Sequence, residues 1–254
     1  MKLTLIGNGF MAQALARGLV NNFEIEIIGR DINKLNVIKE QIPQIEVNEL
    51  SDNESIDNKN IIFCVKPYAL QSVAARLSGE ANILFSILAG TKLESLKNQI
   101  KAKYYIRTMP NVGASVSKST TAITGDLEAK NLALELFNYI GKAVWVNTET
   151  QLDIATAVAG SGPAYLSLIA ESLSDGAVKA GLDRSTSNEL VQGLFEGFAE
   201  LLKDQHPAII KDSVMSPGGT TAAGVAQLEE GAVRDSMIKT VEAAYNKACE
   251  IGKK

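Results

Sequence analysis

Residues 2–12, KLTLIGNGFMA, decide the fold. A short apolar run ends at Gly7, and a helical pattern begins after Gly9. The turn has the form GxGxxA, in which glycine permits a tight bend and lets the backbone approach a pyrophosphate, while the N–H groups that open the helix attract the phosphates. The stretch therefore predicts a dinucleotide site rather than an ordinary glycine turn. The residues expected beside the cofactor are Gly7, Asn8, Gly9, Phe10 and Met11.

Outward from this turn, the first 147 residues alternate strand and helix patterns. Strands are predicted at 2–7, 24–29, 60–65, 82–88, 104–109 and 143–147. Helices are predicted at 10–21, 31–41, 67–77, 91–101 and 127–140. Because strands that alternate with helices indicate βαβ units, we expect an α/β domain with a Rossmann-type, mostly parallel sheet.

The pattern changes near Thr148, after which no strand is expected. Thr148 and Gln151 are spaced as a capping box, and Gly181 is expected to end the long helix that follows. Other helices are predicted at 184–203, 222–230 and 232–251, and His206 is expected at a helix start with Pro207. We place a boundary between a dinucleotide-binding domain, 1–147, and an all-α domain, 148–254.

The composition excludes several kinds of chemistry. The 254 residues include one histidine and two cysteines, so a multi-histidine metal site is excluded and no metal is predicted. Cys64 lies in an apolar run and is expected to be a buried thiol. A net charge of −4 argues against a nucleic-acid partner. Neither a secretory signal nor an apolar run of about 18 residues is recognisable, which predicts a cytoplasmic protein without a membrane partner.

The end of the second strand bears on the choice of cofactor. An acidic residue there would bind a ribose 2′-hydroxyl, as in NAD sites. Here Gly29 is followed by Arg30, which together with Lys34 suits a 2′-phosphate. The sequence therefore favours NADPH, with NADH as the alternative, because Asp31 could either cap the next helix or bind the ribose.

Two further strand ends should lie at the same edge of the sheet. Val65, Lys66 and Pro67 follow one strand, and Lys66 either lines the cofactor cleft or belongs to a simple turn opened by Pro67. Met109 and Asn111 follow another strand. Asn111 either holds the nicotinamide carboxamide or is a turn residue.

Two glycine motifs stand in the helical part. Residues 160–165, GSGPAY, concentrate helix-breaking costs, so Ser161 and its neighbours are expected to approach a ligand or another helix closely. Residues 216–221, SPGGTT, precede a helix. They form either a turn with a Ser or Thr cap, or an anion site suited to a substrate carboxylate.

Together these motifs resemble those of the Δ1-pyrroline-5-carboxylate reductase family over nearly the whole chain. The resemblance includes GNGFMA, VKP, RTMPN and the long segments 159–182 and 206–231, the last being the most specific. The chain has MPNVGA and AGSGPAY where that family usually has MPNTPA and SGSGPAY.

The resemblance implies reduction of pyrroline-5-carboxylate to L-proline with NADPH or NADH, the last step of proline biosynthesis. It also implies a homodimer with interleaved helical domains, which in this family commonly assembles further into decamers. By position, the substrate-binding residues would be Ser216, Gly218, Gly219, Thr220 and Thr221. The Thr221 hydroxyl would be the catalytic group facing the ring nitrogen.

Two rival functions differ in their sequence requirements. A β-hydroxyacid dehydrogenase should carry a catalytic lysine in the long helix, but residues 152–178 contain none. A non-catalytic NADP-binding sensor would have no reason to keep SPGGTT.

Overall fold

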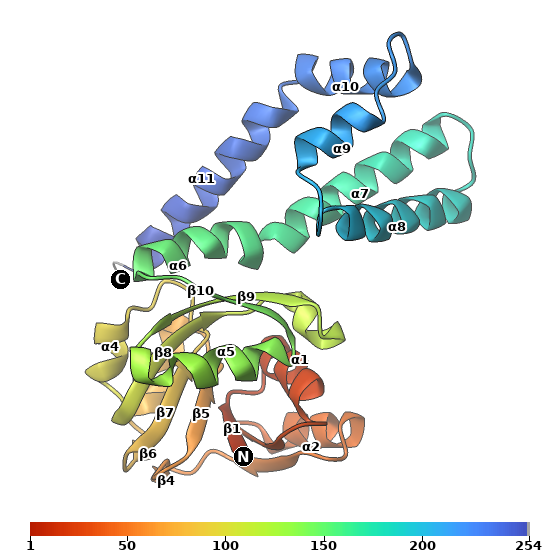
Figure 1. Ribbon diagram of the computed structural model, residues 1–254. Helices are drawn as coiled ribbons and strands as arrows, with labels where there is room; N and C mark the ends of the chain where they lie inside the picture. The colour runs from red at the N-terminus through yellow and green to blue at the C-terminus, as the bar shows by residue number, and fades with distance from the viewer. Residues whose placement is uncertain (253–254) are drawn as a thin grey trace. The chain divides into compact units, whose positions relative to one another are not determined.

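The computed structural model describes residues 1–252 and contains two compact units (Figure 1). One unit consists of Met1–Ser161 and the chain from Ala243 onward, and the other is Gly162–Glu242. The last strand of the larger unit ends at Trp145, and every regular element that follows it among the described residues is helical. The predicted change from α/β to all-α is therefore present.

The larger unit is built on an eight-stranded sheet in the order β10-β9-β8-β7-β5-β1-β2-β3. The strands are β1 (Lys2–Ile6), β2 (Glu24–Gly29), β3 (Glu46–Glu49), β5 (Asn60–Phe63), β7 (Ala81–Ser86), β8 (Ala102–Met109), β9 (Ser119–Gly125) and β10 (Gly141–Trp145). All neighbours are parallel except β8 and β9. The predicted Rossmann-type, mostly parallel sheet is confirmed. The strand order reverses between β1 and β5, where such sheets bind ligands.

The six predicted strands are present, but four others were not predicted. β3 is a short, polar strand at the edge of the sheet, and β9 is rich in threonine. The two-residue strands β4 (Glu54–Ser55) and β6 (Leu77–Ser78) pair with each other in a separate small sheet. None of them has the apolar run by which the others were recognised.

Helices cover both faces of the sheet. Buried apolar residues of α1 (Phe10–Leu19), α2 (Ile32–Gln41) and α5 (Lys130–Asn138) pack on one face. The 3₁₀ turn η1 (Pro67–Ala69), α3 (Leu70–Ala74) and α4 (Leu93–Lys97) pack on the other. Short 3₁₀ turns η2 (Val112–Val116) and η3 (Leu127–Ala129) complete the connections.

Two predicted helices were too long. The one expected at 67–77 is divided into η1 and α3 and ends at Ala74, because the chain then enters β6. The one expected at 91–101 is only α4, Leu93–Lys97. The Asn98, Gln99 and Ile100 N–H groups bond back to α4, and the chain then enters β8.

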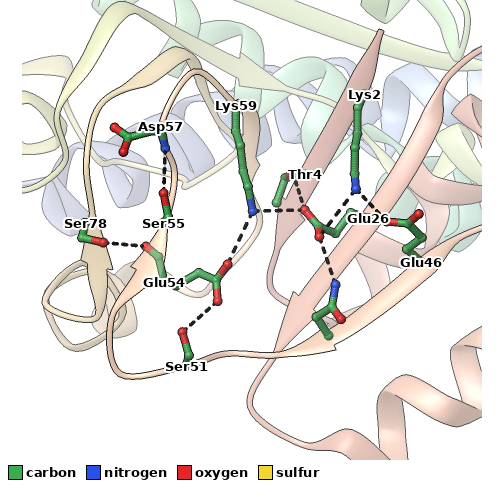
Figure 2. Close-up of polar contacts among 11 residues, drawn as sticks. Lys2, Thr4, Glu26, Glu46, Ser51, Glu54, Ser55, Asp57, Lys59 and Ser78 are labelled. Carbon is green, nitrogen blue, oxygen red and sulfur yellow. Dashed lines mark hydrogen bonds and ion pairs between the residues drawn. The ribbon is translucent and has the colours of Figure 1, made fainter.

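A polar network occupies the amino-terminal end of the sheet, away from the strand ends that bind ligands. Figure 2 shows Glu26 of β2 between Lys2 and Lys59, with Thr4 beside it. Thr4 Oγ1 donates to Glu26 Oε2 at 2.7 Å, while Lys59 Nζ lies 3.4 Å and Lys2 Nζ 3.7 Å from its carboxylate oxygens. Burial tends to raise the pKa of Glu26, but the Thr4 hydrogen bond and the two lysines outweigh it and lower that pKa.

The Glu26→Gln variant should lose less stability in acid than the wild type. A carboxyl whose folded pKa is depressed contributes stability above its unfolded pKa, about 4.3, and loses it as the pH falls through the folded pKa. Urea unfolding at pH 7 and at about pH 3.5 measures the difference. Glu24→Gln, at the exposed start of the same strand, is the control. Equal pH dependence in the Glu26→Gln variant and the wild type would contradict the assignment.

After β10 the chain forms helices α6 (Glu149–Ala155), α7 (Gly162–Lys179), α8 (Arg184–Leu201), α9 (Pro207–Ser213), α10 (Thr220–Glu230) and α11 (Val233–Ile251). The long helical stretch predicted after Thr148 contains a π turn, Thr156–Gly160, which ends at the first residue of the helix-breaking GSGPAY motif. The predicted caps are present: Thr148 Oγ1 accepts from Gln151 N, Gly181 ends α7 with φ +114°, and His206 caps α9 through Nδ1. In the capping box, however, Gln151 Oε1 accepts from Asn147 N rather than from Thr148 N.

One helical stretch among residues 1–252, Glu149–Lys179, is long and apolar enough to cross a membrane by length and composition alone. Such a stretch is weak evidence for a span, and here the π turn interrupts it. Several of its apolar side chains are exposed, including Leu166, Leu168 and Leu173.

Candidate functional site

The glycine-rich turn opens onto a pocket at the carboxyl ends of β1, β2 and β5. Of the predicted cofactor residues, this pocket brings together Gly7, Asn8, Gly9, Arg30, Val65 and Lys66. Phe10 is exposed in the first turn of α1, and Met11 is half-buried against the core. The pocket thus lies where the strand order reverses, as predicted for a dinucleotide.

The two glycines of the turn have different structural roles. Gly7 has φ +118°, and a Cβ there would lie 2.9 Å from the Cys64 carbonyl group, so only glycine fits. Gly9 has an ordinary φ of −73°, and a Cβ there would meet nothing within 4 Å. Gly9 is also the N-cap of α1 and provides no side-chain cap. The space beside it and the uncapped N–H groups suit a phosphate.

Asn8 provides a second indication that a ligand binds at this turn. Its Nδ2 is buried and has no hydrogen-bond partner in the described part of the chain. Buried donors are normally paired, since an unpaired one costs roughly 1–3 kcal/mol. Gly29 gives the side chain its room, because a Cβ at Gly29 would lie 2.9 Å from Asn8 Cγ. The residues present therefore fit the anionic part of a dinucleotide.

Arg30 and Asp31 at the end of β2 bear on the choice between the two cofactors. Asp31 caps α2, because its Oδ1 accepts from the backbone N of Asn33 and of Lys34 at 3.1 and 3.2 Å. Lys34 Nζ lies 3.6 Å from Asp31 Oδ2. Arg30 is exposed and lines the pocket. Asp31 is thus engaged as a helix cap, and Arg30 provides a cation at the pocket.

The end of β5 forms the other side of the pocket. Val65 and Lys66 line it, whereas Pro67 opens η1 and lines a neighbouring hollow. Cys64 is buried as predicted, and burial raises the pKa of its thiol well above the ordinary value. This thiol therefore stays protonated and unreactive beside the pocket.

Asn111 connects the end of β8 to the π turn. Its Oδ1 accepts from Gly113 N at 2.9 Å, and its Nδ2 donates to the Ala159 carbonyl at 2.9 Å. Pro163 has no N–H, so it cannot bond to that carbonyl four residues before it. The Asn111 amide supplies the missing donor. Both ends of the Asn111 side chain thus form hydrogen bonds within turns, as expected if Asn111 is a turn residue. A contact with the nicotinamide is a proposal.

Met109 and Ser161 lie near the same connection. Met109 is buried against Leu152, and a Cβ at Gly160 would lie 3.6 Å from its Cγ. Ser161 directly follows the π turn and donates its N–H to the Thr156 carbonyl at 3.0 Å. Single π turns are frequent at functional sites.

A buried ion-pair cluster that the sequence analysis did not predict supports this region. The Arg107 side chain is 1% exposed; its Nη1 lies 2.9 Å from Glu149 Oε1, and its Nη2 lies 2.8 Å from Asp153 Oδ1. Glu149 Oε1 also accepts from Leu93 N at 2.8 Å. The cluster fixes α6 to β8, so it supports the helix that leads into the π turn. The sequence signal that could have indicated this cluster is Arg107 itself, a charged residue within the mostly apolar strand β8.

The SPGGTT segment forms a sharp turn in the helical unit. Gly219 N donates to the Ser216 carbonyl at 3.0 Å, and Gly218 has φ +72°. With Pro217 in second position, these features match a type II turn. Gly219 caps α10 with no side-chain hydrogen bond, and α10 starts at Thr220 rather than at the predicted 222. Of the two alternatives for this segment, the turn is present but the Ser or Thr cap is not, so the first N–H groups of α10 have no side-chain cap.

The fold and the pocket beside its glycine-rich turn define a Rossmann-type dinucleotide-binding protein with an added helical unit. Family models agree: residues 2–90 match "NADP oxidoreductase coenzyme F420-dependent", and residues 149–251 match "Pyrroline-5-carboxylate reductase dimerisation".

Comparison with individual proteins identifies the family. The chain is 39% identical to the pyrroline-5-carboxylate reductase of Synechocystis, covering 100% of this chain and 99% of that protein. It superposes on the Plasmodium falciparum pyrroline carboxylate reductase with NADP bound at a TM-score of 0.84, with 29% identity over 99% and 98% of the two chains. The Streptococcus pyogenes enzyme gives a TM-score of 0.86, with 29% identity over 98% of both. The chain belongs to the pyrroline-5-carboxylate reductase family.

Proposed function

We propose that this protein reduces Δ1-pyrroline-5-carboxylate to L-proline with NADPH, the last step of proline biosynthesis. The observation that carries the proposal is full-length similarity to a protein named for this activity. The same chain also contains the nucleotide pocket and the uncapped SPGGTT turn. The test adds pyrroline-5-carboxylate to purified protein and NADPH, and measures NADPH oxidation and L-proline. Tight NADPH binding without turnover would instead favour a sensor.

The cofactor is assigned to the pocket of the larger unit. Asn8, Gly9 and the first N–H groups of α1, at Phe10 and Met11, would hold the pyrophosphate. Val65, Lys66 and Pro67 border the nucleotide, and Met109, Asn111 and Ser161 are assigned to its nicotinamide end. When bound, NADPH supplies the hydride that reduces the C=N bond.

Arg30→Ala should weaken NADPH binding by about 10-fold or more and NADH binding much less. A charge-assisted hydrogen bond to phosphate contributes roughly 1.5–3 kcal/mol, and NADH lacks the 2′-phosphate. Titration calorimetry with both nucleotides measures the two affinities. Arg30→Lys, which keeps the charge, is the matched control. Equal losses for both cofactors would contradict this assignment.

The substrate carboxylate is assigned to the SPGGTT turn. Ser216 and the N–H groups at Gly218, Gly219, Thr220 and Thr221 are the donors, helped by the positive end of the α10 dipole. The Thr221 hydroxyl would hold the ring nitrogen. An imine protonated by solvent is already electrophilic, so these groups chiefly orient the substrate and need not include a strong acid.

Thr221→Ala should lower turnover by about 10- to 100-fold, the scale of one positioned hydrogen-bond or proton-transfer contact. Thr221→Ser keeps the hydroxyl and should retain most activity, while Thr220→Ala controls for the first turn of α10. Steady-state kinetics with saturating NADPH measures all three. Unchanged kinetics in Thr221→Ala would remove this hydroxyl from the mechanism.

The helical part is assigned to self-association. A domain division after residue 147 is supported by the match of residues 149–251 to a dimerisation model. Large apolar side chains are exposed along this part, including Leu190, Leu194 and Phe198. We assign these side chains to a homodimer with interleaved helices that can assemble further into decamers. Analytical ultracentrifugation tests the assembly.

The remaining assignments concern the cellular setting. A net charge of −4 disfavours nucleic acid, and the exposed apolar residues of α7 are assigned to a second copy rather than to a membrane. The proposed location is the cytoplasm.

A further inference from the structure

Tyr68 is the most exposed aromatic side chain among residues 1–252, at 86%. No ring contact or hydrogen bond of this side chain is present in that part of the chain. Tyr68 lines the nucleotide pocket and also the neighbouring hollow that contains Pro67. An aromatic ring without protein contacts at the edge of a ligand pocket can stack its face on a flat group of the ligand.

The backbone that carries Tyr68 is firmly held. Pro67 opens η1, Ala69 N donates to the Lys66 carbonyl at 2.8 Å, and the Leu70 N–H bonds to Pro67. Ala69 and Leu70 are buried in the core beneath this turn. The exposed ring therefore projects from a fixed turn rather than from a loose loop.

The position of the ring within the pocket indicates which part of the nucleotide it faces. The pocket also contains Arg30 and, at 3% exposure each, Leu50 and Val73. Leu50 is tied to the end of β2 by a 2.8 Å bond from its N–H to the Gly29 carbonyl. Arg30 marks the adenosine side, since it is the residue assigned to the 2′-phosphate. Leu50 and Val73 supply an apolar floor on that side.

We infer that Tyr68 is the stacking platform for the adenine ring of the cofactor. The inference rests on the proposed use of NADPH. Adenine is flat and needs apolar contact on its faces, which the ring of Tyr68 and the apolar floor provide. Stacking of a base on an aromatic side chain tolerates every base, because each has a π face, and it is measurable by alanine substitution.

The test measures binding of three probes to Tyr68→Ala, Tyr68→Phe and wild-type protein by calorimetry. The probes are NADPH, 2′,5′-ADP, which has only the adenosine half, and reduced nicotinamide mononucleotide, which lacks it. Tyr68→Ala should weaken NADPH and 2′,5′-ADP by roughly 5- to 100-fold. It should leave the mononucleotide unchanged, while Tyr68→Phe should stay within about 2-fold of wild type, because the ring and not the hydroxyl stacks.

Two further measurements separate stacking from a structural role. Tyr68→Ala should weaken NADH as much as NADPH, unlike Arg30→Ala, and should raise KM for NADPH with little change in kcat. Tyr68→Trp should bind 2′,5′-ADP with a change in indole fluorescence that wild type, whose only tryptophan is Trp145, does not show.

Unchanged 2′,5′-ADP affinity in Tyr68→Ala would overturn the inference and assign the ring to the adjoining hollow lined by Thr91, Gln99 and Ile251. Equal losses for the mononucleotide would also overturn it. The binding measurements use no pyrroline-5-carboxylate, so failure of the proposed reaction would leave them interpretable.

Discussion

Replacing Gly9 with valine should weaken NADPH binding by at least roughly 100-fold, equivalent to about 2.7 kcal/mol, while the protein still folds. The new side chain would enter the open space beside Gly9, where a Cβ would meet no atom within 4 Å apart from its own chain neighbours. The phosphates then could not approach the uncapped N–H groups of α1. The φ of −73° suits valine, so the cost to folding should not exceed about 1 kcal/mol, the scale of a poorer N-cap.

Gly7→Ala is the matched contrast because its Cβ would strike the Cys64 backbone and its φ is +118°. That variant should lose thermal stability as well as binding. Calorimetric titration with NADPH and thermal unfolding by circular dichroism measure both properties. Wild-type NADPH affinity in Gly9→Val would move the pyrophosphate away from the start of α1.

Replacing Arg107 with alanine should destabilise the protein by about 3–5 kcal/mol, the usual cost of removing one partner from a buried ion pair. The change leaves Glu149 and Asp153 of α6, whose side chains are 31% and 14% exposed, without their cation. It should also weaken cofactor binding, since α6 leads directly into the π turn before Ser161. Urea unfolding at a fixed protein concentration measures the loss.

A triple variant tests whether charge is the cause. Arg107→Met combined with Glu149→Gln and Asp153→Asn removes all three charges and keeps similar volumes. Replacing a whole buried cluster with neutral groups is often close to neutral, so most of the lost stability should return. If the triple variant is as unstable as Arg107→Ala, packing rather than the ion pairs holds α6.

The sequence predicts those features that depend on interactions between residues close together in the chain. Apolar runs located six strands, and the GxGxxA turn located the pocket, because both depend on neighbouring residues. β9 was missed because its buried positions include Thr121 and Thr124, at 0% and 4% exposure. Ser119 Oγ lies 3.1 Å from Thr121 Oγ1 and accepts from Asn111 N, so polar groups are buried there at little cost.

Other features depend on distant contacts and could not be predicted locally. Arg107 meets Glu149 only through the packing of α6 on β8, and Asn111 meets Ala159 only through the π turn. The missing hydrogen-bond partner of Asn8 Nδ2 can be recognised only when the atoms around it are known. The π turn itself was expected only as an interruption near Gly160, since glycine and proline mark a break without specifying its geometry.

Helices α1 and α10 share one feature: the N-cap of each is a glycine, Gly9 or Gly219, that offers no side-chain cap. Such helix starts bind small anions of any origin. Sulfate and inorganic phosphate are therefore expected to compete with both the nucleotide and the substrate carboxylate. The choice of buffer salt, and not only its ionic strength, would then set the apparent affinities. Raising the NADPH concentration should relieve the inhibition at α1, and raising the substrate concentration should relieve the inhibition at α10.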